Sequence, residues 1–172
     1  MTHLIPQDQL EALIPTDANG LPKYIDMQGY RNIINHEPKR HWVEVNKYAG
    51  NSKYIPIGII EELLREIYPA WEAKQIGQPQ ILANSVVVSV ELRVFHPILN
   101  YWLTYPGVGA VPIQVNAGAS PNDWTQIKSD AMHKNVPAAL SYAISNAAKK
   151  IGRLFGGHLN RNTSELWKQI II

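Results

Sequence analysis

The sequence contains no cysteine among its 172 residues. This absence excludes a disulfide scaffold, a zinc site with thiolate ligands and a cysteine nucleophile. Charged residues are also scarce, at 17%, whereas hydrophobic residues reach 45%, so the composition is neither that of a disordered chain nor that of a long coiled coil. A chain of this length can bury one core, and we expect a single folded unit.

Long apolar runs are absent as well. No stretch approaches 18 apolar residues, and the first residues, MTHLIPQDQLEAL, lack the basic start and the apolar run of a secretory signal. We therefore expect a soluble intracellular protein that has no membrane partner.

The motifs of nucleotide hydrolysis, metal binding and catalysis are also missing. The segment GVGAVP has no lysine and no following helix, so it does not match a phosphate-binding loop for ATP. His36, Glu37 and His41 lack the spacing of a helical metal site, and Pro38 interrupts them. We expect a protein that is not an enzyme and that needs neither a metal nor another cofactor.

Charge is unevenly distributed along the chain. The net charge is +2, but residues 1–127 carry −3 and residues 128–172 carry +5. Five basic residues and no acidic residue occur between residues 131 and 164. Such a segment favours an anion-binding face; alternatively, its cations offset the dipole at the end of a helix.

The pattern of breakers and apolar residues predicts an α+β domain with a short extension at each end. Residues 1–40, rich in proline and glycine, are expected to form an N-terminal arm with a short helical piece at Gln7–Ile14. Residues 41–160 form the expected folded domain, and residues 161–172 form a tail used for packing or for a subunit contact.

Within the domain, HWVEVNKY, AGNS and KYIPI indicate a hairpin that starts at residue 41. A helix is predicted over residues 58–68 and a strand over residues 85–95, followed by a second strand at 100–105 that completes an antiparallel hairpin. The segment YPGVGAVP is expected to be a loop. A second helix is predicted from Val136 to Phe155, with Pro137 at its start.

Three cations crowd one side of this second predicted helix. Lys149 and Arg153 are four residues apart and Lys150 and Arg153 are three apart, so the charges repel one another unless an anion lies over them. One turn earlier, the same side continues with neutral hydrogen-bonding groups, those of Tyr142, Ser145 and Asn146. The expected ligand is a nucleic-acid backbone, because Lys and Arg neutralise phosphates while short polar groups tolerate any base sequence.

A second group of basic and aromatic residues lies in the predicted hairpin, and it consists of Lys47, Tyr48, Lys53 and Tyr54. Aromatic rings beside cations are typical of surfaces that stack the bases of a single strand. Taken singly, each tyrosine also fits a half-buried position in a strand.

Three segments follow one another in the chain: KYIPIGIIEELLREIYPAWEA, SVVVSVELRVFHPILNYWLTYPGVG and ALSYAISNAAKKIGRLFGGHL. Together they resemble the annealing domain of the Rad-fifty-two family of recombination proteins, which includes phage-encoded single-strand annealing members. The resemblance spans about residues 42–160 and rests on the order and spacing of Tyr54, Gly58, Trp71, Arg93, Gly107, Gly109, Lys149, Lys150, Arg153, Phe155 and Gly156.

The resemblance implies a β-β-β-α core, with an antiparallel sheet packed on helices, and subunits that assemble into rings or helical filaments. Single-stranded DNA would lie in a basic groove around the outside, and complementary strands would anneal during homologous recombination and DNA repair without ATP. It also implies a single-strand binding protein or a nuclease as a further partner. For a phage or mobile-element protein, the location would be the cytoplasm of a bacterial host.

The resemblance also assigns DNA-binding residues by position. The floor of the groove would carry Lys149, Lys150 and Arg153, and the hairpin beside it would carry Lys47 and Lys53. The expected set is completed by Tyr54 and Arg93.

Two other classes of protein fit the same residues. A sheet backed by helices with a basic helix end also describes modules that bind double-stranded RNA or DNA. An interaction protein whose basic helix contacts an acidic partner is the third reading. Preference for single strands, together with self-assembly, distinguishes an annealing protein from both.

Overall fold

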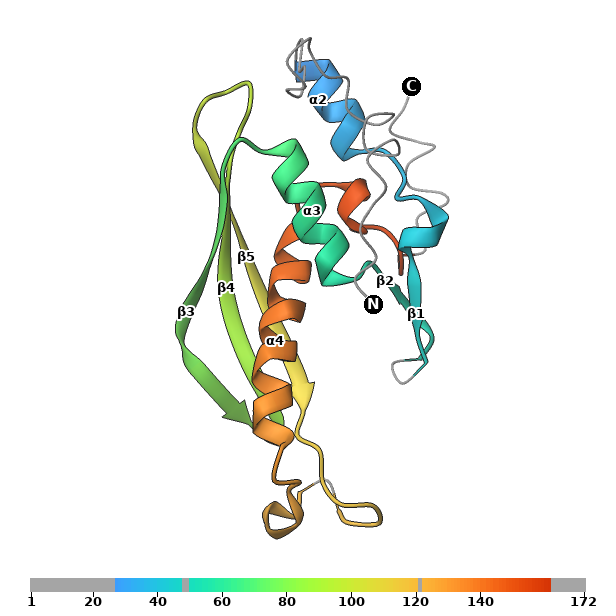
Figure 1. The fold of residues 1–172 in the computed structure, drawn as a ribbon, viewed down its shortest axis with the longest axis vertical. Coiled ribbons are helices and arrows are strands. Elements are labelled where there is room, and N and C mark those ends of the chain that lie inside the picture. Colours follow the sequence, from blue (N-terminus) through green and yellow to red (C-terminus); the bar gives the residue numbers. More distant parts are fainter. Residues whose placement is uncertain (1–26, 48–49, 121, 162–172) are drawn as a thin grey trace.

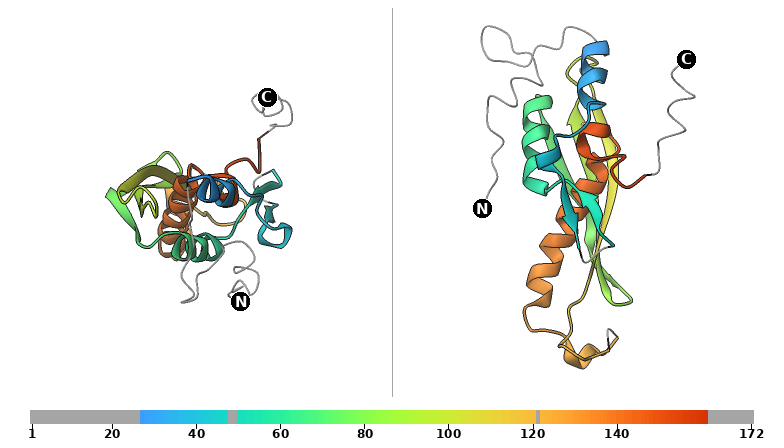
Figure 2. Two further views of the ribbon diagram at one scale, coloured as in Figure 1. Left: turned by 90° about the horizontal axis from the view of Figure 1, so that it is seen from above. Right: turned by 90° about the vertical axis from the view of Figure 1, so that its right-hand side faces the viewer.

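The computed structural model describes residues 27–47, 50–120 and 122–161, which form three layers (Figure 1). A three-stranded antiparallel sheet is one layer, two long helices pack along one of its faces, and a two-stranded hairpin lies beyond the helices (Figure 2). The predicted α+β class, with its antiparallel strands, is therefore confirmed.

The large sheet consists of β3 (Trp71–Leu82), β4 (Ser85–Phe95) and β5 (Trp102–Pro112), in that order. Strand β4 lies in the middle and alternates between fully buried and half-buried residues along its whole length. The fully buried face consists of Val86, Val88, Val90, Leu92 and Val94. Residues alternate in this way because one face of the strand packs on the helices, whereas the described helices leave the other face uncovered. The strand predicted over residues 85–95 is thereby confirmed.

Strand β5 corrects the prediction for the segment after Tyr105. We expected a loop over YPGVGAVP, but β5 continues through it and pairs with β4 as far as Pro112, opposite Ser85. Gly107 and Gly109 are buried, and a Cβ atom on either would overlap a backbone carbonyl oxygen of the helix behind the sheet. These glycines allow a strand and a helix to approach closely, and they do not mark a turn.

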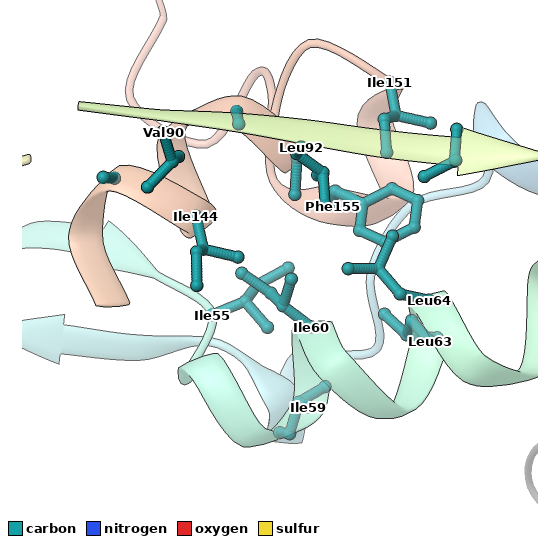
Figure 3. Packing of buried hydrophobic residues seen from close by; sticks show 14 of the residues in the cluster. Ile55, Ile59, Ile60, Leu63, Leu64, Val90, Leu92, Ile144, Ile151 and Phe155 are labelled. Atoms are coloured by element: carbon teal, nitrogen blue, oxygen red, sulfur yellow. The ribbon is translucent and has the colours of Figure 1, made fainter. Parts of the chain in front are cut away.

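Helix α3 (Ile57–Ile67) confirms the helix predicted over residues 58–68. Its buried side is formed by Ile59, Ile60, Leu63, Leu64 and Ile67. These side chains pack with residues of β4, including Leu92, and with Ile144 and Phe155 from the C-terminal part of the chain (Figure 3). Full burial of each such side chain contributes about 1.5–3 kcal/mol.

The predicted hairpin is present as β1 (Glu44–Asn46) and β2 (Ser52–Tyr54), paired in antiparallel fashion. It is preceded by α2 (Met27–Ile34) and by the short 3-10 helix η1 (Arg40–Trp42), of which α2 falls within the expected arm. The side chains of Tyr30, Ile33 and Trp42 join the same core as α3 and β4.

The predicted bounds of the second helix, Val136 to Phe155, were wrong at both ends. Helix α4 (Ala131–Ala148) begins before Pro137 and ends before Lys149 and Lys150, which lie in the following turn. Arg153 starts a separate 3-10 helix, η3 (Arg153–Phe155). Between the two, the extended backbone at Gly152 passes so close to the carbonyl group of Ile34 that a Cβ atom would not fit. The chain therefore leaves the helix, and the three cations do not share one helix face.

Several expected features lie outside the described residues. They are the helical piece at Gln7–Ile14, Tyr48, and the tail after residue 161. In the part of the chain that the structure describes, no helix has the length and apolar character needed to cross a membrane.

Candidate nucleic-acid interface

A groove with a volume of about 830 Å³ runs between the β1–β2 hairpin and α4. The hairpin contributes Lys53 and Tyr54 to its lining, and α4 contributes Tyr142 and Asn146. We call it the hairpin groove, and its full lining is Asn46, Ser52, Lys53, Tyr54, Ile55, Pro56, Ile57, Ala110, Val111, Pro112, Gln114, Ser141, Tyr142, Ser145, Asn146, Lys149 and Asn160.

A second hollow of about 560 Å³ lies at the C-terminal end of α4. We call it the basic hollow, and its lining is Asn146, Lys149, Lys150, Gly156, Gly157, Asn160 and Arg161. Asn146, Lys149 and Asn160 line both hollows, so the two are neighbouring parts of one surface. Neither lining, among the described residues, includes an aspartate or a glutamate.

Asn160 fixes the hairpin to the C-terminal turn. The Lys53 backbone N–H donates to Asn160 Oδ1 over 2.8 Å, and Asn160 Nδ2 donates to the Lys53 carbonyl over 2.7 Å. The turn that carries Asn160 lies against the turn that directly follows α4, because Gly157 approaches the Lys149 carbonyl too closely for any Cβ atom. The hairpin cation and the cations that follow α4 are thereby held in one arrangement.

The end of α4 is also fixed to strand β5. Asn146 Nδ2 donates to the Val108 carbonyl over 2.9 Å, and Lys149 Nζ donates to Asn146 Oδ1 over 3.0 Å. Lys150 Nζ donates to the Pro106 carbonyl. Both ammonium groups are therefore held by neutral acceptors, and their charges are not cancelled by these contacts.

The electrostatics of the groove favour an anion at Lys149. Burial lowers the pKa of the Lys149 ammonium, because removing water disfavours the charged form. A phosphate beside it would restore the stabilisation that burial removes. On the opposite wall, Tyr54 donates a hydrogen bond to Glu44 over 2.6 Å, and this bond raises the pKa of Tyr54 to about 12, so the phenol stays neutral.

The structure brings together residues that the sequence placed in two separate groups. Lys53 and Tyr54 from the hairpin line the same groove as Lys149, and Lys150 lies in the adjoining hollow. Lys47 is exposed at the end of β1, directly after Asn46, which lines the hairpin groove.

Arg153 lies elsewhere and has a carboxylate partner. Its guanidinium pairs with Glu37, and the same carboxylate lies 2.5 Å from His158 Nε2. Burial and the nearby Arg153 charge lower the pKa of His158. The predicted helix that carried Arg153 contains no acidic residue to pair with it. The sequence did not reveal that Glu37, in the segment after α2, is its partner. Arg153 therefore links that segment to the C-terminal part of the fold.

Arg93 lies on the uncovered face of the large sheet, away from the two hollows. It alternates with the buried Leu92 and Val94, pairs with Glu72 on the neighbouring strand, and stacks over the ring of Trp102 with 4.9 Å between its Cζ atom and the ring centroid. These contacts hold the Arg93 side chain on the sheet, and Arg93 lines neither hollow.

Two polar residues of the basic hollow, Asn160 and Arg161, were not among the predicted site residues. The sequence does give a signal for Arg161, because it is one of the five basic residues in the segment without acidic residues, 131–164. For Asn160 there was no signal, because its role depends on a contact with a residue 107 positions away in the chain.

No metal centre is formed by the described residues, in which no three His, Asp or Glu side chains cluster. His96 is buried and caps a turn, where its Nδ1 accepts from the backbone N–H groups of Ile98 and Leu99 over 3.2 and 3.1 Å. Burial lowers the pKa of His96, which is consistent with a neutral structural ring.

Comparisons with known proteins do not place the chain in a family: no family model matches it, and no curated protein matches it.

Proposed function

We propose that this protein binds single-stranded DNA and anneals complementary strands during homologous recombination, without ATP and as a homo-oligomer. The observation that carries the proposal is the joined surface of the hairpin groove and the basic hollow. It gathers Lys53, Lys149 and Lys150 among neutral amides and hydroxyls, with no carboxylate in either described lining. Such a surface neutralises phosphates without reading base identity.

The order of elements supports the same proposal. Three antiparallel strands, β3, β4 and β5, are followed by α4, which packs along one face of their sheet. This order is the one that the resemblance to the Rad-fifty-two family implies for its β-β-β-α core.

The uncovered sheet face supports self-assembly. The register places Ile76 and Val108 on either side of Ser89 on this face, where they are 43% and 55% exposed. Exposed apolar side chains grouped on a sheet are typical of a surface that contacts another subunit.

We assign the phosphate contacts to Lys149 and Lys150, with Lys53 and Lys47 on the hairpin beside them. Arg153 is left out of this set because its guanidinium pairs with Glu37. We propose that it supports the interface by anchoring the turn that follows α4.

A salt titration tests the assignment. For the double variant Lys149→Ala/Lys150→Ala, the log-log salt slope for single-stranded DNA should fall in magnitude by about 0.7 per contact, or about 1.4 per bound subunit. The control Lys128→Ala/Lys134→Ala removes the same charge from the other end of α4 and should leave the slope unchanged. Arg153→Ala should also leave it unchanged. An unchanged slope in the first variant, with the protein folded, would refute the assignment.

An annealing assay tests the activity itself. Complementary oligonucleotides should pair faster with the protein present, equally with and without ATP and magnesium, and electron microscopy should show rings or filaments. Tighter binding to duplex than to single strands would favour a double-stranded nucleic-acid module. Salt-sensitive binding to acidic proteins without nucleic-acid affinity would favour the interaction protein.

A further inference from the structure

The two hollows differ in chemistry although they share a wall. The basic hollow is lined by cations, amides and two glycines. The hairpin groove adds two aromatic rings, Tyr54 and Tyr142, and the aliphatic side chains of Ile55, Val111 and Pro112. A phosphate suits the first lining, whereas the second suits a flat ligand with apolar faces and polar edges.

Tyr142 is the more exposed of the two tyrosines that line the hairpin groove. Ala139, Ala143 and Ala147 of α4 are completely buried against the sheet, whereas Tyr142 is 43% exposed. The core therefore does not account for an aromatic side chain at this position. Tyr54, across the groove, is held in place by its hydrogen bond to Glu44.

From this arrangement we infer that Tyr142 stacks against a nucleobase in the hairpin groove while the basic hollow binds an adjoining phosphate. The inference rests on the proposed binding of single-stranded DNA and deepens it, because it gives base and phosphate separate places. Lys149 lines both hollows, so its ammonium lies at the junction between the base and its backbone. Stacking of this kind accepts any base, since every base has a π face.

Two oligonucleotides of equal length test the inference, one ordinary and one with abasic sites throughout, so that the phosphates are the same and the bases are absent. The natural protein should bind the ordinary strand more tightly. Tyr142→Ala should lose about 5- to 150-fold in affinity for the ordinary strand and should bind both strands equally. Tyr142→Phe, which keeps the ring, should behave as the natural protein, and the salt slope should be the same in all three.

Tyr101 provides a matched control. It is a similarly exposed tyrosine, at 49%, in the turn between β4 and β5, and Tyr101→Ala should keep the preference for the ordinary strand. Folding of each variant is checked by its melting temperature. Equal affinity of Tyr142→Ala and the natural protein for the ordinary strand would overturn the inference, as would an equal loss on the abasic strand. If the natural protein bound neither strand, the proposed function would fail and the inference with it.

Discussion

The side chain of Asn160 pairs with the backbone of Lys53 through both its oxygen and its nitrogen, across 107 positions of the chain. This pair of hydrogen bonds holds the β1–β2 hairpin at a fixed distance from the turn after α4. Because the hairpin forms one wall of the groove, the groove depends on this contact as well as on the residues that would bind a ligand.

We predict that Asn160→Ala loosens the hairpin. Removing two hydrogen bonds of about 0.5–1.5 kcal/mol each should lower the free energy of unfolding by about 1–3 kcal/mol. The Lys53 amide should also exchange its hydrogen faster, measured by mass spectrometry or NMR. Asn122→Ala, in an exposed loop, is the control and should change neither quantity. Unaltered protection of the Lys53 amide in Asn160→Ala would contradict the prediction.

A second prediction concerns the close approach of β5 to α4. Gly107→Ala and Gly109→Ala should each lower the free energy of unfolding by at least about 1–3 kcal/mol, because the added methyl group would overlap the backbone of α4. Gly58→Ala is the matched control. No atom lies within 4 Å of a Cβ at that position in α3, so alanine should be neutral or stabilise by up to about 1 kcal/mol. Urea unfolding distinguishes these outcomes, and equal stability of the Gly107 and Gly58 variants would show that the helix can move aside.

These glycines lie in a part of the fold that could not be predicted from the local sequence. The period-two pattern of β4 and the three-and-four spacing of α3 depend on apolar side chains, so both elements could be predicted from local sequence. In β5 the residues that face α4 include Gly107 and Gly109, and a glycine in a strand has the same local signature as a glycine in a turn. Only the neighbouring helix distinguishes the two cases.

In the candidate site, too, residues in local clusters could be predicted, whereas features that depend on distant segments could not. Lys53, Tyr54, Lys149 and Lys150 were found because clusters of cations and aromatics are visible along the chain. The end of α4 could not be found, because it depends on Gly152 passing close to Ile34 from a distant segment. The pairing of Arg153 with Glu37 has the same origin, so a cation counted in a local cluster proved to belong to a tertiary contact.

The last prediction uses the pH dependence of Lys149. Burial lowers its pKa below 10.5 in the folded protein, so the folded state loses this proton at a lower pH than the unfolded state does. As the pH rises through the lowered pKa, the unfolded state binds more protons, and the free energy of unfolding should rise. The affinity for single-stranded DNA should fall over the same interval, because the neutral amine no longer attracts a phosphate. Stability and affinity should thus change in opposite directions.

Lys149→Arg isolates this effect, because a guanidinium stays charged throughout the interval. Relative to the variant, the natural protein should gain stability and lose DNA affinity as the pH rises toward 10.5, measured by urea unfolding and by fluorescence anisotropy at constant ionic strength. The variant is the reference at each pH because Tyr30 and Tyr54, whose pKa values are raised from 10.0 to about 12 in the folded protein, ionise first in the unfolded state above pH 10 and lower the stability of both proteins there. If the natural protein and Lys149→Arg gave parallel curves for both quantities, the Lys149 ammonium would be neither perturbed by burial nor in contact with a phosphate, and the assignment of this residue would be wrong.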